Sequence, residues 1–134
     1  MWADIRQKII QVIKDNCDKT DTVSYCDSSK FSNYPAIVVS PSDNEADFSS
    51  SQEDQYTFIF NIQVHQLISD AGQEQAEKIV EEILDQLLVV FKDHGILAAA
   101  CDWTTPAVSQ WLYQDREDGQ HRVGTIKLKC VKFA

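Results

Sequence analysis

The sequence predicts an α+β fold in which an N-terminal helix and a long central helix pack on one mainly antiparallel β-sheet. Two stretches carry apolar residues at helical spacing, over residues 2–15 and 73–94. Two other regions read as strand pairs joined by turns or loops. The chain has 134 residues, 43% of them hydrophobic, which suits one core and one domain spanning residues 1–134.

Both helices are predicted from the positions of their apolar side chains. In the first helix, Trp2, Ile5 and Ile9 recur on one face and polar residues take the other. The second helix has the strongest pattern in the chain, and residues 69–72 offer capping groups before it. We expect it to end at His94, with Gly95 as a left-handed cap.

The first strand pair is expected on either side of a long polar loop. Pro35 precedes the β-branched run Ala36–Val39, and Pro41 closes it. Residues 56–64 then alternate between apolar and polar side chains, as in a half-buried strand. The segment 41–55 between them is rich in Ser, Asp and Glu and is expected to be a mobile loop. The polar segment 16–34 has room for one short strand at most.

A second hairpin is expected to close the chain. Strands are predicted over 108–113 and 122–133, with the tip at 114–121, where Asp118-Gly119 is a strong turn signal. The alternation breaks at Val131, which indicates a bulge or a change of neighbours. Residues 96–106 are expected to be a connection with room for a short strand.

Charge and cysteine usage exclude several classes of function. The formal net charge of −9 repels phosphate backbones and anionic lipids, so tight binding to nucleic acid or a membrane surface is not expected. No apolar run approaches the ~20 residues that cross a bilayer, and Met1-Trp2 does not begin a signal-peptide pattern. We therefore expect a protein of the cytosol whose four cysteines are buried thiols or thiols without a role; a Cys17–Cys26 bridge is the alternative.

The residue types that carry chemistry do not form a recognisable site. Five carboxylates between Glu74 and Asp85 are interpreted as a solvated helix face. His65, His94 and His121 lie in three different elements and are interpreted as surface or capping groups. Residues 43–47 partly resemble a calcium loop but lack its glycine and its final glutamate. The sequence thus predicts no enzyme, no cofactor and no metal site.

With these elements in place, nearly the whole chain resembles the tail-terminator (tail-completion) proteins of tailed bacteriophages. The resemblance lies in the layout: an amphipathic helix over 2–15, the strand 35–39, the strand 56–67 after a polar loop, the helix 73–94, and a closing hairpin. The lysine-alternating strand 125–133 ends that hairpin. Pro35–Val39, followed by Ser40-Pro41-Ser42 and an acidic loop, is the part most similar to that family.

The resemblance implies a structural virion protein without catalytic residues. Such a protein forms a ring, expected to be a hexamer, that caps the tail tube, stops its polymerisation and forms the tail side of the head–tail junction. The partners would be other copies of the chain, the tube protein and a head-completion connector protein. DNA would pass through an acidic lumen without specific binding. The location would be the virion neck, and the host cytoplasm during assembly.

The candidate interface residues lie in two loops and one strand. Phe48 is the expected apolar anchor of the first loop, and the lysines form a positive stripe that suits an acidic patch on a neighbouring copy or blunts an exposed strand edge. The full set is Asp43, Glu45, Asp47, Phe48, Glu53, Asp115, Arg116, Glu117, Asp118, Lys127 and Lys129. The alternatives are a head-side neck connector and a small acidic monomeric binding module or inhibitor. A third is an enzyme, which would require a deep pocket where His65 or the carboxylates of the long helix converge.

Overall fold

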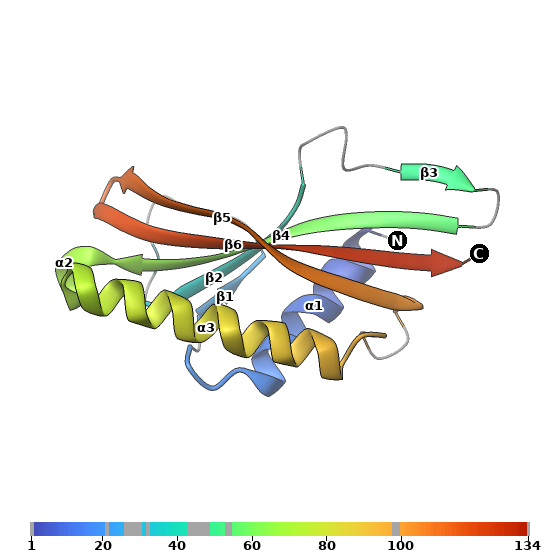
Figure 1. The fold of residues 1–134 in the computed structure, drawn as a ribbon, viewed down its shortest axis with the longest axis horizontal. Helices are drawn as coiled ribbons and strands as arrows, with labels where there is room; N and C mark the ends of the chain where they lie inside the picture. Colours follow the sequence, from blue (N-terminus) through green and yellow to red (C-terminus); the bar gives the residue numbers. More distant parts are fainter. Residues whose placement is uncertain are drawn as a thin grey trace.

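A computed structural model describes residues 2–20, 22–25, 31, 33–42, 49–52, 55–97 and 100–133, with the backbone alone described at 49–52 and 55. The helices are α1 (Trp2–Asn16), α2 (Ile68–Ala71) and α3 (Gln73–Asp93). The strands are β1 (Thr22–Ser24), β2 (Ala36–Pro41), β3 (Ser49–Gln52), β4 (Gln55–Leu67), β5 (Trp103–Arg116) and β6 (Gly119–Phe133). The predicted α+β class, with a mainly antiparallel sheet and two packed helices, is confirmed (Figure 1).

The strands form one sheet in the order β1-β2-β4-β6-β5, and β3 pairs with β4 beside this path. The β1–β2 pair is parallel, and the other pairs are antiparallel. The longest register without a shift joins β4 to β6, from Gln55 opposite Phe133 to Leu67 opposite His121. Both predicted hairpins are therefore present, and β4 and β6 together form the centre of the sheet.

The main core lies between the sheet and the two helices, which cover the same face (Figure 1). α1 contacts β1 and β2, whereas α3 contacts β4, β5 and β6. Helical periodicity explains the assignment, because the residues that α1 and α3 bury recur at three- and four-residue spacing. We call the opposite face of the sheet the far face. None of the described helices is long and apolar enough to cross a bilayer.

The polar segment expected to be one mobile loop over 41–55 contains a strand. Pro41 belongs to β2, Gln55 begins β4, and β3 pairs with β4 through Ser49 opposite Thr57. A backbone ladder requires no apolar side chains, so serines at an otherwise open part of β4 pair despite their composition. The rest of the expected loop, residues 43–48 and 53–54, lies outside the described residues.

The ends of two elements differ from the sequence-based expectation. The residues expected to cap α3 instead form the helical turn α2, and Gly72, with φ 84°, stands at the start of α3 without a side-chain cap. His94 does end α3, but the left-handed residue after it is Leu97, with φ 46°, and not Gly95. The connection before the second hairpin is also shorter than expected, because β5 begins at Trp103.

Leu87 tests the face of α3 assigned to the core. Its side chain is fully buried between the helix and the sheet. Leu87→Ala is expected to lower the free energy of unfolding by about 2–5 kcal/mol, since it leaves a cavity. Chemical denaturation measures this loss, and an unchanged midpoint would contradict the assigned helix face.

Gly124 tests the close approach of α3 to β6. A Cβ at this position would lie 2.6 Å from Leu84 Cδ1 and 2.9 Å from Val80 Cγ1. Gly124→Ala is therefore expected to lower stability by about 1–3 kcal/mol through overpacking. Gly95→Ala is the matched control, because its Cβ would meet no atom closer than 3.6 Å. Equal melting temperatures for the two variants would show that α3 packs less closely.

Candidate interaction surface

The tip of the second hairpin is a tight turn held by pairing on both sides. Asp115 lies opposite Gln120 and Arg116 opposite Gly119, so Glu117 and Asp118 form the turn. Gly119 has φ 133°, which explains the Asp-Gly signal. The structure therefore brings together four of the predicted interface residues, Asp115 to Asp118, at one end of the sheet.

Asp118 points back from this turn into a cluster of polar side chains. Its carboxylate accepts hydrogen bonds from the Tyr34 hydroxyl and from His121 Nε2, the latter at 2.8 Å. His121 Nδ1 lies 3.1 Å from His65 Nδ1. The Phe31 ring packs against the His65 ring, with 5.2 Å between the two ring centroids. We call Tyr34, His65, Asp118 and His121 the histidine cluster. It ties the segment before β2 to β4 and to the hairpin tip.

The interpretation of His65 and His121 as surface or capping groups is wrong. Both side chains have 0% exposure, because Phe31 and Tyr34 cover this part of the far face. Two ring nitrogens 3.1 Å apart share one proton, so one imidazole donates and the other accepts. His65 lies on the polar side of the alternation in β4, which suggested exposure. Only the packing of Phe31 and Tyr34 over the sheet buries these rings.

The histidine cluster shifts the pKa values of its acidic members. Burial acts to raise the pKa of Asp118, but the hydrogen bonds from Tyr34 and His121 outweigh it and leave the pKa below its usual 3.8. Burial, and then the bond to Asp118, raise the pKa of Tyr34 to about 12. The neutral phenol and the ionised carboxylate are thus the forms that the fold favours at neutral pH.

The predicted lysine stripe lies on the far face, some distance from the tip. Lys127 pairs in register with Asn61 and Ala107, and Lys129 with Ile59 and Thr105. Lys127 is half-buried and Lys129 is exposed. At ~3.3 Å per residue along β6, the stripe lies roughly 30 Å from the turn. Asp43, Glu45, Asp47, Phe48 and Glu53, the first-loop candidates, lie outside the described residues.

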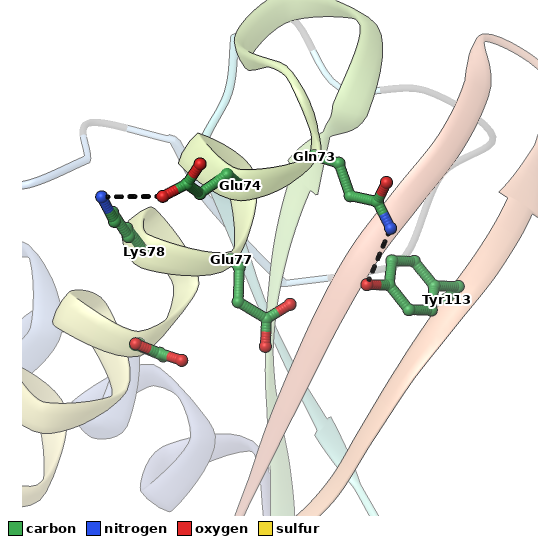
Figure 2. Close-up of a pocket in the computed structure, with 6 residues that line it drawn as sticks. Gln73, Glu74, Glu77, Lys78 and Tyr113 are labelled. Carbon is green, nitrogen blue, oxygen red and sulfur yellow. Dashed lines mark hydrogen bonds and ion pairs between the residues drawn. The ribbon is translucent and has the colours of Figure 1, made fainter.

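The acidic face of α3 borders a shallow cleft beside β5. The cleft, of about 510 Å³, is lined by Gln73, Glu74, Glu77, Lys78, Glu81 and Tyr113. Figure 2 shows Gln73 reaching the Tyr113 hydroxyl across it and Lys78 paired with Glu74 on its rim. Glu77 forms an ion pair of 2.7 Å with Arg122 of β6, so this carboxylate is already neutralised by the protein.

The described part of the chain contains neither a cluster of metal-ligating side chains nor an exposed cysteine. No group of three or more His, Cys, Asp or Glu side chains there is placed to hold a metal ion. Cys17, Cys101 and Cys130 are free and buried, as predicted. Burial raises the pKa of the Cys17 thiol, which disfavours its reactive thiolate. Cys26, the other half of the alternative bridge, lies outside the described residues.

The surface that the sequence analysis missed is strand β5. It lies at one end of the strand order, and its large apolar side chains are exposed. Trp103, Val108, Trp111 and Tyr113 have exposures of 46%, 41%, 40% and 45%. The available signal was the absence of any charged residue from Trp103 to Gln114, in a chain of which 25% is charged.

Comparisons with known proteins do not assign the chain to a family. No family model matches it, and no curated protein matches it. A solved structure with 17% sequence identity superimposes over 99% of this chain and 94% of its own, with a TM-score of 0.45. A likeness of that size supports no inference about function.

Tyr34→Phe tests the histidine cluster. Loss of the hydrogen bond to the Asp118 carboxylate is expected to lower the free energy of unfolding by about 1.5–3 kcal/mol at pH 7. Because the pKa of Asp118 is lowered in the folded state, its contribution is present above the ordinary value of 3.8 and is lost as the pH falls below it. The difference between wild type and variant should therefore shrink in acid.

Denaturant titrations from pH 3 to pH 7 measure this effect, with the exposed Tyr56→Phe as the control. On the alkaline side, the wild type should lose stability as the pH rises from 10 to about 12, because the Tyr34 pKa is raised, and Tyr34→Phe should lose less. Parallel profiles for the wild type and Tyr34→Phe would contradict the cluster.

Proposed function

We propose that this chain is a structural virion protein that caps the tail tube of a tailed bacteriophage, ends tube polymerisation and forms the tail side of the head–tail junction. The family resemblance of the sequence is the basis of the proposal. The order of elements that carries this resemblance, α1, the β2–β4 pair, α3 and the β5–β6 hairpin, supports it.

The single observation that carries the mechanism is the separation of charge between the two sides of the sheet. Four carboxylates are exposed on the outer face of α3: Glu81 and Asp85, together with Glu74 and Glu82, which pair with Lys78 and Lys19. Lys127 and Lys129 lie on the far face, on the opposite side of the same sheet. A copy of the chain therefore offers complementary charge to the next copy in a head-to-tail arrangement.

Head-to-tail contacts between different surfaces produce a closed ring when the rotation between copies closes. We assign the α3 face of one copy and the lysine stripe of the next to this contact, in a ring that we expect to be hexameric. One face of the ring would match the last ring of the tube, and the other would not, which ends growth. The net charge of −9 would let DNA pass through the ring without adhering.

We assign the hairpin tip to docking on the tube or on the head connector. The Asp118 contacts with Tyr34 and His121 hold the turn in place, so its ordering costs little entropy on binding. Asp115 and Glu117 are exposed there and present an acidic edge to a basic partner surface. The same location would serve a head-side connector, which is the alternative within this class.

Growth of tail tubes in the presence of the purified chain tests the proposal. With the tube protein encoded by the same genome, the wild type should shorten the tubes and appear by negative-stain imaging as a ring at one end. Lys129→Glu places like charge against the acidic α3 face, so it should raise the concentration needed for arrest roughly tenfold. Lys8→Glu, at an exposed position of α1, is the matched control.

Unrestrained tube growth and the absence of rings on the tubes would overturn the capping function. A monomer that ignores tubes but binds a basic protein would instead favour the acidic binding module. Loss of capping in Lys8→Glu as well as Lys129→Glu would show that the lysine stripe is not a specific contact.

A further inference from the structure

The two end strands of the main strand order, β1 and β5, differ in how their outer backbone groups are occupied. The edge strand β1 has three residues, and the neighbouring Thr20 hydroxyl accepts the Thr22 N–H at 3.1 Å. Arg6 donates to the carbonyl oxygens of Tyr25 and Val39, the latter at 2.8 Å. Side chains of the protein therefore occupy backbone groups at this edge and limit the addition of another strand.

The β5 edge is open over a much greater length. No described strand pairs with the outer side of β5, which runs from Trp103 to Arg116. Natural proteins commonly protect such edges with charged side chains. Here the residues from Trp103 to Gln114 carry no charge, although the chain as a whole carries −9. A long, uncharged and aromatic edge is the surface that strand addition uses.

We propose that a second copy of this chain pairs with β5 through its own β5, in antiparallel orientation, to form a two-fold dimer. A continuous sheet between copies needs an open edge on each, and β1 is blunted. The only other described edge is that of β3, which has four residues, so we assign the contact to β5 on both sides. Such a contact is isologous and closed after two copies. Neutrality of β5 also allows two acidic chains to approach at this strand without bringing carboxylates together.

The register of β5 against β6 defines which residues would meet. Val108 lies opposite Ile126 and Gln110 opposite Thr125, so Ser109 is the extra residue of a bulge. Trp103 lies opposite Val131 and Arg116 opposite Gly119, and Gln110 is at the midpoint of this ladder. Full overlap of two antiparallel β5 strands therefore places Gln110 against Gln110 of the second copy, on the two-fold axis.

In this register the strand complements itself. Val108 meets Trp111 of the second copy, and Pro106 meets Tyr113, both on the side of the sheet that carries α3. On the far face, Trp103 meets Arg116, which suits a cation–π contact. Cross-strand pairs of an aromatic ring with an aliphatic side chain are stabilising. Pro106 and the bulge at Ser109 interrupt the ladder only locally, and they limit strand addition without preventing it.

The dimer does not depend on the capping function. A two-fold axis makes the two sides of a dimer equivalent, whereas a cap needs two different faces. We therefore assign the dimer to the protein before assembly, where it covers the aromatic edge. Capping would require the dimer to open or to remain at the rim of the ring.

Solution mass in the absence of tail tubes tests the dimer. The full-length wild type should have twice the chain mass of 15.2 kDa by light scattering after size exclusion, and it should dissociate on dilution. Val108→Lys should raise the dissociation constant about tenfold or more, because it places a lysine in the edge twice per dimer. Val89→Lys is the matched control, because Val89 is 58% exposed on α3, away from the edge.

A cysteine at the axis tests the register and does not depend on a change in stability. Gln110→Cys should give a disulfide-linked dimer under mild oxidation, whereas Gln75→Cys, exposed on α3, and the wild type should give none. A monomeric wild type without Gln110→Cys cross-linking would overturn the proposal. A wild type that forms a ring, with the same mass in Val108→Lys, would also overturn the dimer. If that ring capped tubes, the proposed function would still stand.

Discussion

The pairing of β6 with β4, along the whole length of β4, determines where the other features of the molecule lie. It joins residues 55–67 to residues 133–121 in one unbroken register. On one side of these strands lies the core with α3, whose close approach is possible because Gly124 has no side chain. On the other side lie the histidine cluster at one end and the lysines further along β6. A shift of one residue in this register would exchange the two faces.

The same pairing explains why the polar groups of the far face are divided into buried and exposed sets. His65 and His121 lie near the end of β4 and the start of β6, where Phe31 and Tyr34 cover the sheet. Hydrogen bonds to Asp118, between the rings and to Gln63 Oε1 satisfy these nitrogens, which burial without partners would make costly. Beyond this covered region the lysines reach solvent.

The surface offers two kinds of contact with different symmetry. Opposite charges on α3 and on the far face suit unlike surfaces, as in a ring, while the uncharged edge of β5 suits like surfaces, as in a dimer. In the proposed ring, the exposed carboxylates of α3 form a binding face. Glu77 is engaged by Arg122, and the remaining carboxylates of the helix are spread along its solvent side.

The sequence alone determined the elements and their order, because apolar side chains at helical or alternating spacing are local signals. It located α1, α3, both strand pairs and the Asp118-Gly119 turn. Only the tertiary structure decided that His65 meets His121, 56 residues away, and that β5 forms the open edge. Burial of a polar residue and exposure of a strand edge depend on which distant segments cover them. A local pattern such as the uncharged run from Trp103 to Gln114 does not say which segments these are.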